Sequence, residues 1–262
     1  MSTPPPQIPS PQTSRETGPT LEAGAEAMAQ LQRYLLPASV PTVPGYEFAV
    51  YYRPCEAAGG DFYGFQPFAD GRMGFVVADV AGHGAVAAVM MAALRSALAA
   101  FRVFGRLRES APQDVNAIVN EIGVPGMFIT AFFVSLDPAA QVFYSGNCGH
   151  PPAIIRRAGG ELEMVNGEGS VPLGILPEIA PPTIASVFHA GDALVLYTDG
   201  ISEARAVGGT EFGLRGLIDA LGPANDATAQ GVCDAIVRAL RQHEHGAAPQ
   251  DDQCILVCKQ LG

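Results

Sequence analysis

The sequence contains no CxxC pair, no long apolar run and very little lysine, and each absence excludes a class of protein. Its five cysteines are an odd set without zinc-ribbon spacing, so neither a disulfide framework nor a zinc site is indicated. No apolar run reaches the roughly 18 residues of a membrane span, and no basic, apolar signal segment opens the chain. We therefore expect reduced thiols and a cytoplasmic location.

Positive charge is scarce, and this bears on the kind of partner. Lys and Arg number 15 against 26 Asp and Glu, the net charge is −11, and Lys259 is the only lysine. Such a chain repels phosphate backbones and anionic lipids, so we expect no nucleic acid and no membrane partner. With 262 residues, 48% of them hydrophobic, the chain can build one large core.

Composition divides the chain into three parts. Residues 1–20 are rich in Pro, Ser, Thr and Gln and are predicted to be a disordered tail. Residues 21–37 are predicted to form a regulatory or linker helix that Pro37 ends, followed by one large domain over 38–262. Leu21, Met28 and Leu35 are seven residues apart, so the helix 21–36 is interpreted as a control point, either a homodimer seam or the docking site of a regulator. Docking on its own domain is the alternative.

The expected elements alternate as strand hairpins and helix pairs rather than as repeated βαβ units. This order favours an α+β fold, with antiparallel sheets and helices packed outside them, over a doubly wound fold. In the long helix expected over 85–104, the apolar face is predicted to run through Val89, Ala93, Ser96 and Ala100. The strands are expected at 46–52, 62–68, 73–78, 128–136, 142–145, 153–157, 162–165, 184–188, 193–197 and 253–259, and the other helices at 112–122, 214–221 and 227–243.

The stretch 74–88, GFVVADVAGHGAVAA, is the strongest local signal of a site. A short β-branched strand stops at Asp79, and a glycine-rich turn then opens a helix. A buried carboxylate without a partner loses several kcal/mol of hydration, so it needs a hydrogen-bond donor or a cation. An ordinary helix N-cap is the alternative interpretation of Asp79.

Other carboxylates are predicted to meet Asp79 at the same sheet edge. Asp61 opens the strand that pairs with the Asp79 strand through a turn at Asp70 and Gly71, so the two side chains share one end of a hairpin. Asp199 ends a second apolar strand, in ALVLYTDG. The pair Asp251-Asp252 stands directly before the strand 253–259, and antiparallel pairing would bring this pair beside Asp199.

Convergent carboxylates require cations. Two of them about 4 Å apart repel by roughly 4 kcal/mol at an effective dielectric near 20, so the set must bind metal or titrate. All-oxygen ligands favour Mg²⁺ or Mn²⁺ over zinc. Two such ions can activate a water and stabilise a phosphoryl group, which indicates phosphate ester hydrolysis.

At these residues the sequence resembles the PPM-type (protein phosphatase 2C-like) serine/threonine phosphatases, specifically the bacterial SpoIIE/RsbU-like branch. The resemblance extends over about residues 31–257, and the order and spacing of the motifs carry it. The motifs are LLP at 35–37, GGDFYGF at 59–65, ADVAGHG at 78–84, MFITA at 127–131, GNCGHPP at 146–152, PLGI at 172–175, GDALVLYTDGISEAR at 191–205 and DD at 251–252.

The resemblance implies a fold, a metal site and a substrate. The fold would be a four-layer αββα sandwich in which helices flank two central antiparallel sheets. Asp79 would bridge two Mn²⁺ or Mg²⁺ ions, Asp61 and the Val80 carbonyl would bind one ion, and Asp199 and Asp251 the other, with Asp252 as an alternative to Asp251. Members of this branch typically dephosphorylate a STAS-domain anti-sigma factor antagonist in a partner-switching pathway.

The sequence departs from the family pattern at three places, one of which is Cys148-Gly149-His150 where the family commonly has AGH before the paired prolines. Gly64 stands where the family usually has aspartate, and Ala81 stands where the eukaryotic branch has histidine, so His83 does not inherit an acid role and the leaving-group acid is unassigned. These departures motivate an alternative function, a catalytically weak PPM-fold module that binds a partner. Hydrolysis of a small phosphoester is a third interpretation.

Several nearby side chains are given structural roles. His150, which stands between a glycine and two prolines, is interpreted as structural. Cys148 is also interpreted as structural, because it lacks the close arginine of a cysteine phosphatase. Glu203 and Arg205 are predicted to form a supporting ion pair, and Arg53 is a candidate phosphate contact.

Overall fold

The computed structural model describes residues 30, 34–56, 59–82, 85–104, 111–165, 167, 169–222 and 228–262. The predicted tail 1–20 and most of the predicted helix 21–37 lie outside these residues, so both stay predictions. Within the described ranges, none of the helices combines the length and apolarity needed to cross a bilayer.

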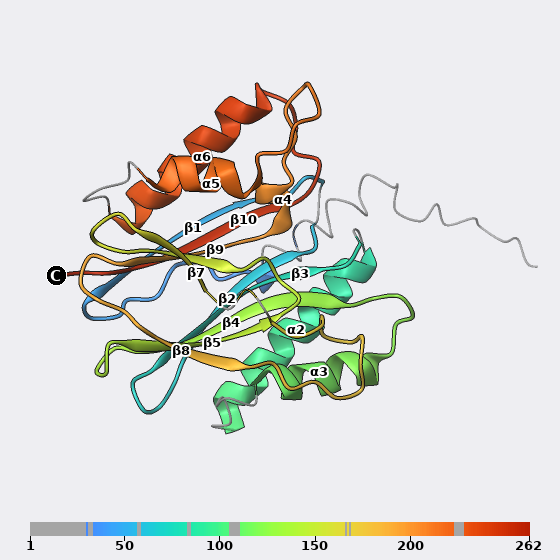
Figure 1. Cartoon of the computed structure of the whole chain (residues 1–262). Coiled ribbons are helices and arrows are strands. Elements are labelled where there is room, and N and C mark those ends of the chain that lie inside the picture. The colour runs from blue at the N-terminus through green and yellow to red at the C-terminus, as the bar shows by residue number, and fades with distance from the viewer. Residues whose placement is uncertain are drawn as a thin grey trace, which may run out of the picture.

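Two five-stranded antiparallel sheets form the centre of the molecule (Figure 1). Sheet A has the order β1-β10-β9-β6-β7 and sheet B the order β2-β3-β4-β5-β8. The strands of sheet A are β1 (Tyr46–Arg53), β10 (Gln253–Gln260), β9 (Ala193–Tyr197), β6 (Ala153–Arg156) and β7 (Leu162–Val165). Those of sheet B are β2 (Asp61–Pro67), β3 (Met73–Val80), β4 (Ile129–Asp137), β5 (Val142–Cys148) and β8 (Thr183–Val187).

Helices cover the outer face of each sheet. Sheet A is covered by α4 (Asp199–Ser202), α5 (Gly213–Leu221) and α6 (Ala229–Glu244), and sheet B by α2 (Ala85–Phe104) and α3 (Ala111–Ile122) (Figure 1). The predicted α+β, four-layer sandwich is confirmed, and the expected strands and helices are found within a few residues of their predicted ends.

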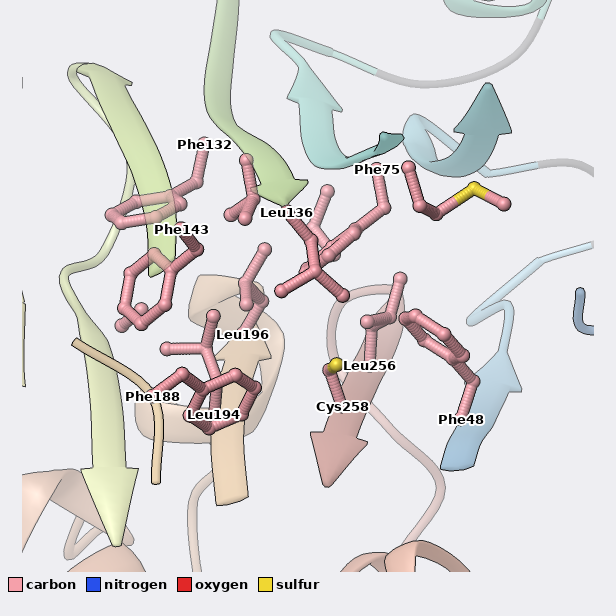
Figure 2. Packing of buried hydrophobic residues seen from close by; sticks show 14 of the residues in the cluster. Phe48, Phe75, Phe132, Leu136, Phe143, Phe188, Leu194, Leu196, Leu256 and Cys258 are labelled. Atoms are coloured by element: carbon pink, nitrogen blue, oxygen red, sulfur yellow. The ribbon is translucent and has the colours of Figure 1, made fainter. Parts of the chain in front are cut away.

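The space between the sheets is filled by aromatic and aliphatic side chains (Figure 2). Phe48 of β1 meets Phe75 of β3 edge to face, with 5.5 Å between the ring centroids. Cys254 and Cys258 point into this same layer, and burial raises the pKa of both thiols. Their role is packing, because alternate residues of a strand share one face and residues 254 and 258 both point into the core.

The predicted apolar face of α2 is wrong. Val89 is 59% exposed and Ser96 is exposed, with its hydroxyl donating to the Ala92 carbonyl at 2.7 Å. The face that packs on sheet B instead carries Ala87, Ala88, Met90, Met91, Leu94 and Ala97. An alanine-rich helix offers several overlapping stripes at helical spacing, and only the sheet beneath it selects one.

Candidate active site

The hairpin of β2 and β3 places two carboxylates opposite each other. Asp61 is the register partner of Asp79, at the end of sheet B where β2 begins and β3 stops. Asp61 is only 1% exposed, and its Oδ2 accepts a hydrogen bond from Thr198 Oγ1 at 2.7 Å. Thr198 directly follows β9, so this bond crosses from sheet B to sheet A.

Sheet A brings its own carboxylates to this edge. Asp199 begins α4 one residue after Thr198, and Asp251 and Asp252 precede β10. The ends of β9 and β10 meet because Tyr197 pairs with Ile255. Thr198 closes the pairing, since its N–H donates to the Cys254 carbonyl at 3.1 Å and its Oγ1 accepts from the Cys254 N–H at 3.0 Å.

Asp251 and Asp252 are neighbours with different environments. Asp252 is 4% exposed, and its two oxygens accept backbone N–H groups, Oδ1 from Cys55 at 2.8 Å and Oδ2 from Gly60 at 2.5 Å. These two hydrogen bonds therefore hold the loop before β2 against the residue that precedes β10. Asp251 is exposed, and its Oδ1 accepts from the backbone N–H of Asp252 at 2.8 Å.

Close backbone approach explains why glycines surround the carboxylates. A Cβ on Gly60 would lie 2.6 Å from the Val80 carbonyl oxygen and 3.1 Å from Asp79 Oδ1. A Cβ on Gly59 would lie 2.0 Å from Asp252 Oδ2, and one on Gly200 would lie 1.9 Å from the Asp252 carbonyl oxygen. A side chain at Gly60 or Gly200 would therefore push apart the backbone segments that carry the carboxylates.

The carboxylates raise one another's pKa values. Burial and the charges of Asp199, Asp251 and Asp252 raise the pKa of Asp79 to about 7. Burial and Asp79 raise the pKa of Asp61 well above its usual range, although the bond from Thr198 opposes the shift. Burial, Asp251 and Glu203 raise the pKa of Asp199. Raised pKa values in facing carboxylates are typical of a site that holds cations.

The raised pKa of Asp79 predicts a pH-dependent stability in chelator. A carboxyl group whose folded pKa of about 7 exceeds its unfolded value destabilises the fold when it ionises, so stability falls as pH rises from about 4 to 7. We expect Asp79→Asn to remove this effect, so its stability advantage over wild type grows by about 2 kcal/mol between pH 5 and pH 7.5. Urea unfolding in chelator measures the difference, and a pH-independent difference would contradict it.

The bridging role of Thr198 predicts a second effect on stability. Thr198→Val keeps the shape but removes the donor to Asp61 and leaves the Cys254 N–H without its acceptor. We expect a loss of about 2–3 kcal/mol in unfolding free energy, because both groups are buried. Thr198→Ser keeps the hydroxyl and should recover most of the loss. A Thr198→Val protein as stable as wild type would show that the hydroxyl contributes nothing to stability.

Other predicted side chains lie elsewhere or have different partners. The predicted Glu203–Arg205 ion pair is wrong, because Arg205 binds Glu211 at 2.8 Å across the turn 205–211. Glu203 and Arg205 do line a small hollow of about 90 Å³ that reaches Asp251. Arg53, the candidate phosphate contact, pairs with Glu244 of α6, with 3.6 Å between Arg53 Nη1 and Glu244 Oε2. His83 lies outside the described residues.

His150 and Cys148 are buried, as their structural interpretation requires. His150 Nδ1 lies 2.8 Å from Thr130 Oγ1, and Thr130 is the register partner of Asp79 on β4. Burial lowers the pKa of His150 to about 3, with the backbone of Tyr197 opposing the shift, so the imidazole is neutral. Burial raises the pKa of Cys148 to about 12, which excludes a thiolate nucleophile.

Gly64 lies on the other face of β2 from Asp61. A Cβ there would lie 3.0 Å from the Phe62 ring and 3.5 Å from Val76, in the layer between sheet B and its helices. Alternate residues of a strand point to opposite faces, so the lack of a carboxylate at this position leaves the cluster of Asp61, Asp79, Asp199 and Asp251 intact.

Several curated proteins are similar to this chain. It is 26% identical to Protein IcfG of Synechocystis sp. over 250 residues, which is 85% of this chain and 39% of that protein. It is 25% identical to Phosphoserine phosphatase RsbU and 22% to Phosphoserine phosphatase RsbP, both of Bacillus subtilis, over 76% and 79% of this chain. The chain spans 39% to 59% of the length of these three relatives.

Solved structures share the fold. The SiaA-PP2C domain of Pseudomonas aeruginosa matches with a TM-score of 0.79 and 21% identity over 92% of this chain and 97% of that one. A structure of the RsbU and RsbW domains of a Mycobacterium tuberculosis protein matches with a TM-score of 0.72 and 28% identity, over 87% of this chain and 63% of that one.

A protein-family model also matches most of the chain. The model of Stage II sporulation protein E (SpoIIE) matches residues 69–260, which include Asp79, Asp199 and Asp251. This match confirms the resemblance read from the motifs, and the PP2C-like neighbours agree with it. The chain therefore belongs to the SpoIIE family.

Proposed function

We propose that this chain is a metal-dependent phosphoserine/phosphothreonine protein phosphatase. The observation that carries the proposal is the convergence of Asp61, Asp79, Asp199 and Asp251 from both sheets on one edge, where the pKa values of the first three are raised. Membership of the SpoIIE family and relatives named phosphoserine phosphatases support it.

The residues at this edge fit two Mg²⁺ or Mn²⁺ ions. The ligands that we propose are all oxygen atoms, as these ions prefer, although the Cys55 sulfur also lies within 4.8 Å of the Asp251 and Asp252 carboxylates. We infer that Asp79 would be shared by the two ions, that Asp61 and the Val80 carbonyl would hold one, and that Asp199 and Asp251 would hold the other. Asp251 is favoured over Asp252 because both Asp252 oxygens already accept backbone N–H groups. When bound, such ions lower the pKa of a water and neutralise charge on phosphoryl oxygens.

The chain's own groups prepare the site. The Thr198 hydroxyl orients Asp61 Oδ2, so the other oxygen of this buried carboxylate is left for a ligand. Gly60 lets the loop before β2 approach the Val80 carbonyl. The hollow beside Asp251 is lined by Glu203, Arg205 and Gln250, and we propose that it receives the phosphorylated side chain. Arg205 would then bind the negatively charged phosphate group.

The substrate that we propose is a phosphorylated STAS-domain anti-sigma factor antagonist in a partner-switching pathway. The relatives named RsbU and RsbP and the neighbour that joins an RsbU to an RsbW domain support this choice. We further propose that the domain covers residues 38–262 and that the helix 21–36 is its control point. Deleting residues 1–36 should change activity or oligomeric state, and a change in neither would rule out this role.

The metal requirement provides the direct test. Purified protein should hydrolyse an aryl phosphate with Mn²⁺ or Mg²⁺ and lose at least about a hundredfold of that rate in excess chelator, because the ions supply several kcal/mol of transition-state stabilisation. Asp199→Asn should lose turnover. Asp219→Asn, a matched change on the exposed face of α5, should not.

Two results would contradict the proposal. Full activity in excess chelator would remove the metal mechanism. Absence of turnover with either ion, together with retained binding of a STAS-domain partner, would indicate the alternative function, a catalytically weak module of the same fold.

A further inference from the structure

A second cavity lies between sheet B and the helices α2 and α3, on the opposite face of the sheet from the carboxylate cluster. Its volume is about 240 Å³, and the residues that line it all belong to the described part of the chain. Pro67 and Ala99 are exposed at its rim, so the cavity opens to solvent. Nothing in the proposed phosphatase chemistry uses this space.

Two rows of residues across sheet B, three of them glycines, form the cavity floor. Neighbouring strands align Gly64, Val76, Phe133, Gly146 and Thr183 in one row, and Gln66, Gly74, Ser135 and Tyr144 in the next. Three glycines and a serine stand where a sheet covered by helices ordinarily carries large apolar side chains. The Phe62 ring lies against Gly64, the Phe68 ring against Gly74 and Pro112 of α3 near Gly146, and the space that these side chains leave open is the cavity.

The walls combine apolar surface with positive charge. Phe62, Phe68, Leu98 and Phe133 supply the apolar part, and Arg72 and Arg95 supply two guanidinium groups. Arg72 is fixed by Asp70 at 2.8 Å and lies over the Phe68 ring, 5.7 Å from its centroid. Arg95 Nη1 donates to the Leu35 carbonyl at 2.6 Å, which ties α2 to the segment before Pro37.

Size and charge together select the ligand. An apolar cavity of about 150 Å³ takes a benzene ring, so this larger one takes a ring and a short chain. Arginine forks bind carboxylates with two parallel hydrogen bonds. We propose that this cavity is a binding site for a small aromatic carboxylate, with the ring against Phe62 and Phe133 and the carboxylate at Arg72 and Arg95.

The proposal can be tested with 3-phenylpropionate and its neutral analogue 3-phenylpropan-1-ol. Calorimetry on the full chain, in chelator so that no metal attracts the carboxylate, should show the acid binding at least about tenfold more tightly than the alcohol, because a charge-assisted bond is lost. Arg95→Gln should reduce acid affinity about tenfold and leave the alcohol unchanged. Arg215→Gln, at an exposed arginine of α5, is the matched control and should bind like wild type.

Variants that add side-chain volume to the cavity floor test the position of the binding site. Ser135→Val adds apolar volume at the centre of the second row and should abolish measurable binding of both probes. Gly146→Ala is the milder variant, because its Cβ would lie 3.5 Å from Pro112, an ordinary contact, and it should weaken binding severalfold. Equal affinity for acid and alcohol would overturn the charge assignment. Unchanged binding by both folded floor variants would overturn the site.

Discussion

Replacing Asp79 by asparagine is expected to lower kcat/KM for aryl phosphate hydrolysis by at least about a thousandfold, or about 4 kcal/mol of transition-state stabilisation. Asparagine has nearly the same shape but no negative charge. Among the carboxylates of the site, Asp79 is the one whose pKa is raised by Asp199, Asp251 and Asp252 together, so it faces the whole cluster. Steady-state kinetics across Mn²⁺ concentrations would measure the loss.

The same substitution should leave the protein folded, and this separates chemistry from stability. Removing one of several mutually repelling charges favours the folded state in chelator, so the inactive variant should be at least as stable as wild type. Asp219→Asn controls for a general effect of the substitution. Loss of less than tenfold at saturating Mn²⁺ would show that Asp79 does not bridge the metal ions.

Gly200→Ala is expected to cost about 3 kcal/mol of unfolding free energy and to impair metal binding at the same time. The new Cβ would lie 1.9 Å from the Asp252 carbonyl oxygen and 3.3 Å from the Asp251 carbonyl carbon. A backbone atom cannot rotate away as a flexible side chain can, so either α4 or the start of β10 must move. Asp199 and Asp251 are carried by these two segments and would separate.

Gly208→Ala is the matched control, because a Cβ at that position meets nothing within 4 Å. Urea unfolding and Mn²⁺ titration of both variants would measure the two effects. A Gly200→Ala protein with wild-type stability and Mn²⁺ affinity would show that the two segments adjust without moving the carboxylates.

The fold and the pairing of the carboxylates could be predicted from local patterns. The turn at Asp70 and Gly71 makes a hairpin, and a hairpin that begins at Asp61 and stops at Asp79 must place both at one end. The strand that ends before Asp199 and the strand that follows Asp252 are also antiparallel neighbours. In sequence, α5 and α6 lie between these two strands, so short-range patterns predicted the hairpin but could offer this second pairing only as a possibility.

The tertiary structure decided which of several equivalent side chains takes each position. Asp251 and Asp252 differ only in what surrounds them, and the Cys55 and Gly60 N–H groups that occupy Asp252 come from nearly 200 residues away in sequence. Two other predictions were wrong for the same reason. Arg205 pairs with Glu211 rather than with Glu203, and α2 buries a different face from the predicted one. Neighbouring carboxylates and overlapping helical stripes have the same local propensities, so only long-range packing distinguishes them.

The cavity under α2 belongs to the same category. Gly64, Gly74 and Gly146 lie on three different strands and form a floor only after the register of sheet B aligns them. In sequence, each is a single glycine in a strand. The sequence by itself thus determined the strands, the hairpin ends and the acidic site that they create, because these follow from local alternation. The register and packing of distant segments, which depend on contacts throughout the chain, decided the partners of each carboxylate and where space was left.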